Sequence, residues 1–150
     1  MSLFDDYKQQ MAQLRADVQN VTHTKLADGL LEAITTSATA RVYDVDFEPV
    51  EYVRRRSFEK KELYGVKRNG LTIEIEALQA GNPDQPPYHK GHIVDIVEGG
   101  GPWDWDHAKS YPPPRPFMQE GVDDYINSGF ADDDLAEGLR ARGYTVTVSY

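Results

Sequence analysis

Residues 67–77 read KRNGLTIEIEA, and this stretch decides the class of fold. Two segments of alternating apolar and polar residues meet at its Asn69-Gly70 pair. Asn-Gly between such segments is a strong hairpin signal, because a type I′ turn needs positive φ at both central residues. In the second segment the apolar face consists of Leu71, Ile73, Ile75 and Ala77, and the polar face of Thr72, Glu74 and Glu76. The sequence therefore predicts an antiparallel hairpin centred on Asn69-Gly70.

An amphipathic helix is predicted at the N-terminus. Its apolar residues recur at alternating steps of three and four, which is a heptad-like spacing. These residues are Phe4, Tyr7, Met11, Leu14, Val18 and Val21. Ser2 can cap the helix, and Asp5 three residues later completes a capping box. We expect this apolar stripe to pack on its own domain; the alternative is that part of it docks on a neighbouring subunit.

A second helix is predicted to begin at Thr22 or Thr24 and to run through an alanine-rich stretch to about Val42. Its apolar side carries Leu26, Leu30, Leu31 and Ile34. Residues 1–42 are therefore expected to form a helical N-terminal part, and residues 47–150 to hold the sheet and everything that follows it.

Two short helices and a strand are predicted at the C-terminal end. Pro116 suits the first position of a helix that ends at Ser128-Gly129. The acidic run Asp132 to Asp134 complements the start of a further helix, which Gly143 closes. Tyr144 to Tyr150 alternates between apolar and polar residues, so we expect a strand that pairs with another strand.

The order of these elements predicts an α+β fold. The chain has 150 residues and a mass of 17.0 kDa, which suits a single domain spanning 1–150. Residues 79–116 are expected to be a long loop, since residues 100–116 alone contain five prolines and two glycines. The expected architecture is N-terminal helices packed on a small, largely antiparallel sheet, with two short C-terminal helices and a final C-terminal strand.

The composition excludes several classes of function. The net charge is −9, which disfavours wrapping of nucleic acid and binding to an anionic membrane surface. No apolar run approaches the roughly 20 residues that span a bilayer. The N-terminus also lacks the basic segment followed by an apolar segment that is typical of a signal peptide. The chain has no cysteine, so disulfides, thiolate metal sites and cysteine nucleophiles are excluded. We expect a soluble, cytosol-compatible protein with no membrane contact.

The most enzyme-like cluster is WDWDH at residues 103–107, where Asp104, Asp106 and His107 carry possible cation ligands. A proline-rich loop with tryptophans is more often an interaction surface. The sequence has no nucleophile elbow, H-E-x-x-H pair, phosphate-binding loop or dinucleotide fingerprint. We expect no enzyme activity, no cofactor and no metal; a small metal-dependent hydrolase centred on this cluster and an acidic inhibitor protein are the alternatives.

The chain contains one basic island. It consists of Arg54, Arg55 and Arg56, followed by Lys60 and Lys61. One interpretation is a strand with alternating, solvated side chains. The alternative is a patch that contacts an acidic partner or passing DNA.

Several separated motifs together resemble a known family. Tyr52, Arg54 and Arg55 lead into the predicted hairpin, and the run HIVDIVEGG follows at 92–100. PPRPF at 113–117 opens a helix, and LAEGLRARGY at 135–144 precedes the last segment. In this order the motifs resemble the tail-completion family of long-tailed bacteriophages, which are small proteins of the virion neck at the head–tail junction.

The resemblance implies a structural role in the virion neck. It implies an α+β subunit, six to a ring around the tail axis, which joins the head connector to the tail tube. DNA would pass through such a ring without specific binding. Tail terminators and neck stoppers share this small design and are the alternatives within the class. The predicted partner-docking residues are Tyr88, Trp103, Trp105, Tyr111, Arg54, Arg55 and Arg56, the aromatic ones being typical interface anchors.

Overall fold

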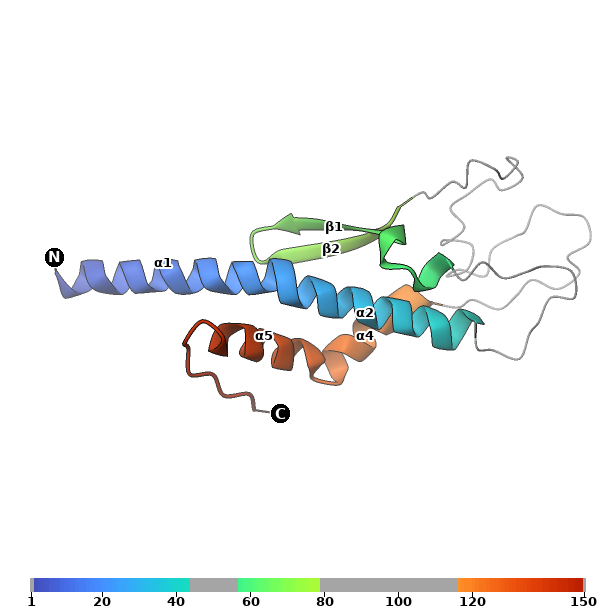
Figure 1. Cartoon of the computed structure of the whole chain (residues 1–150). Coiled ribbons are helices and arrows are strands. Elements are labelled where there is room, and N and C mark those ends of the chain that lie inside the picture. The colour runs from blue at the N-terminus through green and yellow to red at the C-terminus, as the bar shows by residue number, and fades with distance from the viewer. Residues whose placement is uncertain (1, 44–56, 79–115, 150) are drawn as a thin grey trace, which may run out of the picture.

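A computed structural model describes residues 2–43, 57–78 and 116–149 (Figure 1). The first of these ranges is one continuous helical rod, the second carries the hairpin, and the third carries two short helices. The segments of the rod are α1 (Leu3–Val21), the π-helical turn η1 (Thr22–Leu26), α2 (Ala27–Ala38) and a second π-helical turn, η2 (Thr39–Tyr43).

The rod begins at the predicted cap. The backbone N–H of Asp5 donates to Oγ of Ser2 at 3.3 Å, and the backbone N–H of Ser2 donates to the Asp5 carboxylate at 3.3 Å. Each side chain therefore satisfies a donor that the first turn of a helix leaves without an intrahelical partner. The predicted capping box is confirmed.

The predicted break between two N-terminal helices is wrong. The hydroxyl of Thr22 donates to the carbonyl of Val18 at 2.9 Å, and the hydroxyl of Thr24 donates to the carbonyl of Asn20 at 2.8 Å. Both threonines thus bond backward along the helix and do not cap a new one. The chain passes through a π-helical turn at this point and continues as α2 without interruption.

The hairpin lies on one side of the rod and consists of β1 (Tyr64–Asn69) and β2 (Thr72–Ala77). The strands are antiparallel, and Asn69 pairs with Thr72. The two residues of the turn are therefore Gly70 and Leu71, so the predicted centre at Asn69-Gly70 is wrong by one residue. Gly70 has φ of +58°, and glycine at the first central position is the arrangement of a type II′ turn.

From Thr72 to Ala77 the faces of the hairpin follow the predicted alternation, whereas Leu71, which was predicted on the apolar face, lies in the turn and is 51% exposed. Val66 pairs with Ile75, and Arg68 pairs with Ile73. Because pairs directly across a ladder share a face, the apolar residues of β2 lie on the side of Val66. Ile75 and Ala77 pack against the core on that side, while Thr72 and Glu74 are exposed.

The helices α4 (Phe117–Asn127) and α5 (Phe130–Arg140) lie on the other side of the rod from the hairpin (Figure 1). Their bounds confirm the two predicted C-terminal helices. α4 crosses α2 at close range, because Gly121 has no side chain and a Cβ there would lie only 2.9 Å from Cα of Ile34. The hydroxyl of buried Tyr125 donates to Asp134 at 2.7 Å and so joins α4 to α5; burial raises the pKa of Tyr125 well above its usual value.

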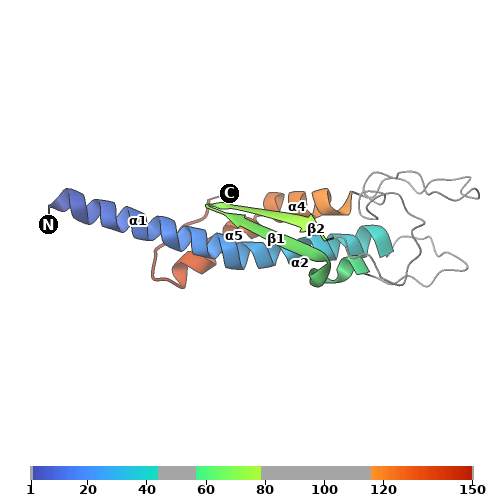
Figure 2. The same cartoon turned by 90° about the horizontal axis from the view of Figure 1, so that it is seen from above.

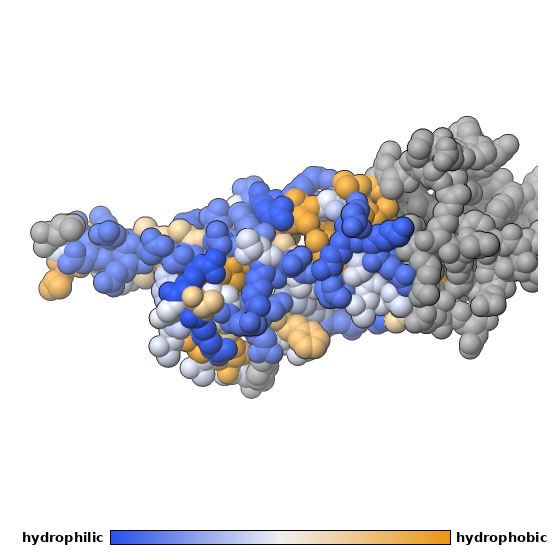
Figure 3. Space-filling model, viewed as in Figure 1, coloured by the Kyte–Doolittle hydropathy of each residue, from blue (hydrophilic) through white to orange (hydrophobic). Residues whose placement is uncertain are grey.

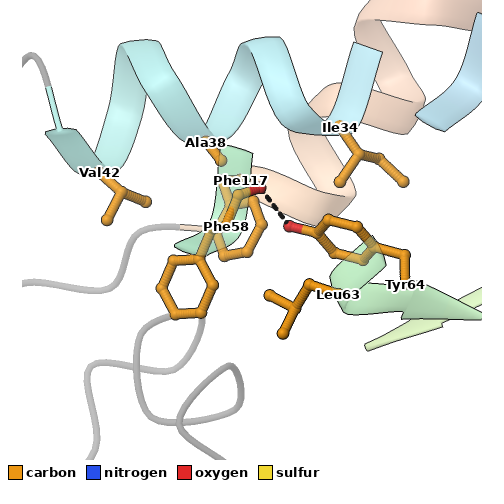
Figure 4. Close-up of a cluster of buried hydrophobic side chains, with 7 residues drawn as sticks. All are labelled: Ile34, Ala38, Val42, Phe58, Leu63, Tyr64 and Phe117. Atoms are coloured by element: carbon orange, nitrogen blue, oxygen red, sulfur yellow. Dashed lines mark hydrogen bonds between the residues drawn. The ribbon is translucent and has the colours of Figure 1, made fainter. Parts of the chain in front are cut away.

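The core forms where α2, α4 and the start of the hairpin meet (Figure 4). Phe117 is fully buried, and its ring stacks on that of Phe58 with centroids 5.3 Å apart. The hydroxyl of Tyr64 donates to the carbonyl of Phe58 at 2.8 Å, so the one polar end of this ring has a partner. The buried members of the cluster are Ile34, Ala38, Val42, Phe58, Leu63, Tyr64 and Phe117.

The predicted C-terminal strand does not form within the described residues. The chain turns after α5, and Tyr144–Ser149 runs back beside that helix without strand pairing (Figure 1). The guanidinium of Arg140 donates to the carbonyl of Val146 at 2.8 Å, which ties the segment to α5. The hairpin lies on the opposite side of the rod from this segment, so neither of its strand edges is beside Tyr144–Ser149 (Figure 1). The α+β class is nevertheless confirmed, with a sheet of two strands.

Candidate interaction surface

The first part of α1 projects beyond every other described element (Figures 1 and 2). The large apolar side chains on this projection are exposed to solvent. Their exposed fractions are 90% for Leu3, 63% for Phe4, 58% for Tyr7 and 46% for Met11. Figure 3 shows the projection standing clear of the body of the molecule. We call these four residues the exposed stripe.

The same heptad spacing continues into the packed half of α1. Leu14 and Val18 are half-buried, and Val21 is fully buried. Val21 lies directly against Gly138 of α5, where an added Cβ would overlap the side chain of Val21. The expectation that the stripe packs on its own domain is thus confirmed for its second half and wrong for its first half.

Polar contacts hold the C-terminal segment against α1 where the exposed stripe gives way to the packed half. The hydroxyl of Tyr144 donates to the Asp17 carboxylate at 2.7 Å, and Arg142 lies 3.6 Å from the same carboxylate. The hydrogen bond from Tyr144 holds the pKa of Asp17 below its usual range. Asp17 therefore stays charged and anchors the turn after α5.

One flank of the exposed stripe is basic. Lys8 lies in the position next to the stripe, and its Nζ stands 4.4 Å from the centre of the Phe4 ring. Arg15 follows one heptad later and is also exposed. The face of α1 opposite the stripe carries uncharged or acidic residues such as Asp6, Gln9 and Gln13. The projection therefore presents an apolar strip bordered by positive charge.

A shallow groove of about 260 Å³ runs between α5 and the C-terminal segment. Its helical wall comes from positions spaced by three and four along α5, and its other wall from successive residues of the extended segment. Its lining residues are Asp132, Leu135, Ala136, Leu139, Val146, Thr147, Val148 and Ser149. This volume lies below the usual range for small-molecule pockets, so the groove suits protein side chains better than a cofactor.

A second hollow, of about 460 Å³, lies between η1 and the hairpin. The guanidinium of Arg68 donates across it to the carbonyl of His23 at 2.8 Å. Lys25 at its edge forms an ion pair with Glu137 at 2.9 Å, and this hydrogen bond raises the pKa of Lys25. Asp28 also lines the hollow, so its lining carries charged side chains of both signs, and these are either paired or exposed to solvent. We therefore interpret this hollow as part of the packing contact between the rod and the hairpin, and not as a ligand site.

Metal-binding chemistry finds no support in the described ranges. Among residues 2–43, 57–78 and 116–149, no group of three or more acidic or histidine side chains is placed to hold a metal ion. The clustered acids Asp132 and Asp133 stand in the first turn of α5, where they complement the helix dipole as predicted.

The predicted docking residues all lie outside the described residues. They are Arg54, Arg55, Arg56, Tyr88, Trp103, Trp105 and Tyr111. The alternative metal cluster of Asp104, Asp106 and His107 lies outside them as well. Both assignments remain predictions from sequence.

The groove beside α5 is a feature that sequence reasoning missed. The sequence pattern places its wall residues Val146 and Val148 only on one face of an expected strand. Their apolar alternation signalled a partner, but not that the partner would be the side of a helix. The exposed stripe, by contrast, was visible in the heptad spacing.

Comparison with models of protein families places the chain in a known family. The model of the YomN family matches residues 6–141, while no curated protein and no solved structure matches the chain. None of the helices within the described ranges is long and apolar enough to cross a membrane. The matched range covers α1 from residue 6 onward, the hairpin, α4 and α5, so it includes Tyr7 and Met11 of the exposed stripe and the helical wall of the groove. The chain therefore belongs to the YomN family and is a phage-related protein.

Proposed function

We propose that this chain is a structural subunit of the phage virion neck, acting in tail completion as a ring that joins the head connector to the tail tube. The observation that carries the proposal is the exposed stripe on the projecting part of α1, in a chain of a phage-related family. Apolar aromatic and methionine side chains displayed in this way are typical of protein–protein contact surfaces. The order of the sequence motifs, which resembles that of tail-completion proteins, favours the neck over other places in the particle.

The charge of the chain fits this role. Each copy carries a net charge of −9, so a closed ring of several copies would be strongly negative. DNA binding depends largely on neutralising phosphates, and an acidic ring repels them. DNA would then pass through the ring without adhering to it.

The proposed role is non-enzymatic. A subunit that bridges two rings needs contact surfaces and no reacting groups, and the sequence contains no recognised catalytic motif. Its partners would be further copies of itself, the head connector and the tail tube. Its place would be the virion, after synthesis in the bacterial host.

The test is a nonsense mutation in the gene of the phage that encodes this chain. We expect lysates to contain DNA-filled heads and complete tails that are not joined, and plasmid expression of the wild-type chain should restore joining. Electron microscopy of the lysate gives the readout, and antibody labelling of restored particles should mark the neck. Joined, infectious particles made without the protein would refute the proposal. Tails of irregular length would instead favour the tail-terminator role.

The same complementation assay tests the predicted docking loop. Plasmids encoding Trp103→Ala together with Trp105→Ala should fail to restore joining, because each change removes an aromatic anchor. Lys109→Ala, from the same stretch, is the matched control and should complement normally. Full complementation by the double variant would rule out these tryptophans as docking residues.

A further inference from the structure

We propose that the exposed stripe of one copy docks into the groove between α5 and residues 144–149 of the next copy. The inference deepens the proposed function, on which it rests for the place of the assembly in the particle. It assigns the interface from two surfaces of this chain: a projecting helix with exposed apolar side chains, and a groove with apolar and polar lining residues. The groove offers the exposed stripe a surface to pack against, which the stripe does not find on its own chain.

The continuity of the stripe along α1 supports a helical partner. In the packed half of the helix, α5 of the same chain covers Val21, where the absence of a side chain at Gly138 allows close approach. In the projecting half of α1, apolar residues continue at the same heptad spacing, but α5 does not extend far enough to cover them. A face with heptad spacing packs well against another helix, because side chains spaced by three and four fit the ridges and grooves of a helical surface.

The groove supplies such a helical surface. Leu135, Ala136 and Leu139 lie at spacings of one and three on one side of α5, and the opposite wall is formed by Val146 and Val148. Asp132, Thr147 and Ser149 add polar groups to this lining, and Ala136 and Leu139 form the buried floor of the groove. The groove is too small for a typical ligand but has room for individual side chains of a helix that lies along it.

Charge also favours the groove over antiparallel pairing with a second copy of α1. Asp132 at the rim of the groove is exposed, and the basic flank of the stripe carries Lys8 and Arg15. Docking the stripe in the groove brings opposite charges together. Antiparallel pairing of two α1 helices would place the equivalent flanks, and so the cations of both copies, side by side, and like charges across a helical interface are unfavourable.

The two surfaces must belong to different copies. Residues 3–11 span about 12 Å of a continuous helix and point away from α5 of their own chain (Figure 1). The exposed stripe therefore cannot fold back onto its own groove. A contact between two different patches of the same chain is heterologous, and repeated contacts of this kind form a ring when the rotation closes.

Cysteine pairing tests the interface directly, because the full chain contains no cysteine of its own. One purified chain carries Tyr7→Cys, and a second chain, larger by an affinity tag, carries Val148→Cys. After mixing and mild oxidation, we expect the main cross-linked product to be the mixed dimer. The control replaces Tyr7→Cys with Gln9→Cys, which lies on the polar face of the same helix. We expect much less mixed dimer from the control, because its thiol lies on the face of α1 that points away from the groove in the proposed contact.

Two results would overturn the proposal. A predominance of dimers between two Tyr7→Cys chains would show pairing of α1 with α1. Equal yields from Tyr7→Cys and Gln9→Cys, or no mixed dimer at the highest soluble concentration, would show that the groove does not receive the stripe. The two tests can fail separately. If the nonsense mutant fails to join heads and tails but cross-linking gives either of these results, the neck role stands and only this interface is refuted.

Charge reversal gives an independent measurement in the cysteine-free chain. Lys8→Glu should weaken self-association in analytical ultracentrifugation, and the effect should shrink at high salt because exposed charges are screened. Combining Lys8→Glu with Asp132→Lys in one chain should restore association, since every contact then pairs the two reversed charges. Failure of the second change to restore any association would contradict the assigned contact.

Discussion

The two halves of α1 have the same sequence pattern and opposite environments. Phe4, Tyr7 and Met11 are exposed, whereas Val21, on the same stripe, is completely buried against α5. The difference arises because α5 and the segment after it extend along only the second half of the helix (Figure 1). The comparison teaches that heptad spacing indicates the presence of a partner for a helix face, and that the tertiary arrangement decides whether the partner belongs to the same chain.

The largest effect is expected at the core that fixes the packed region. Phe117→Ala removes a fully buried ring that stacks on Phe58, so the free energy of unfolding should fall by about 3–5 kcal/mol. Urea unfolding measures the change. Phe130→Ala is the matched control, because Phe130 is 62% exposed and the same substitution should cost less than about 1 kcal/mol there. Similar losses at both positions would mean that Phe117 does not belong to the core.

An intermediate effect is expected where α5 covers the packed half of the stripe. Gly138→Ala introduces a methyl group into the space of Val21, whose β-branched side chain has one preferred rotamer in a helix. Overpacking should cost more than the better helix propensity of alanine gains, for a net loss of about 1–2 kcal/mol. The measurement is again urea unfolding, compared with the same substitution in a Val21→Ala background. An equal loss in both backgrounds would contradict this contact.

The smallest effect on stability is expected in the exposed half. At concentrations where the chain is monomeric, Phe4→Ser with Tyr7→Ser should change the free energy of unfolding by no more than about 0.5 kcal/mol, because both side chains are then largely in water. The same variant should lose self-association in ultracentrifugation. Gln9→Ser with Ala16→Ser, on the opposite face, should change neither property. A large loss of stability in the stripe variant would show that the stripe is part of the fold of its own chain.

Local chemistry made several elements predictable from sequence. The capping box of Ser2 and Asp5 and the acidic first turn of α5 were confirmed, and α4 begins at Phe117, one residue later than predicted, with Pro116 as its N-cap. Each depends on hydrogen bonds or charges within a few residues, so distant parts of the chain have little influence on it.

The errors fall where local signals compete. Thr22 and Thr24 have the side chains of cap residues, but their hydroxyls bond backward and the helix continues. The turn of the hairpin moved by one residue because the pairing of Asn69 with Thr72 puts Gly70 first in the turn. A strand at Tyr144–Tyr150 would need a free strand edge beside it. The strand is not formed because the hairpin lies on the opposite side of the rod (Figure 1).

The sequence by itself determined the class of fold, the amphipathic character of α1 and the acidic charge of the chain, since these follow from residue type and spacing. Only the tertiary structure decided that α5 stops short of the exposed stripe and that the segment after it builds a groove. The physical reason is that burial depends on which distant segments meet. Tyr7 and Val21 occupy the same position in the heptad pattern of α1, yet Tyr7 is exposed and Val21 is buried, because α5 covers only Val21.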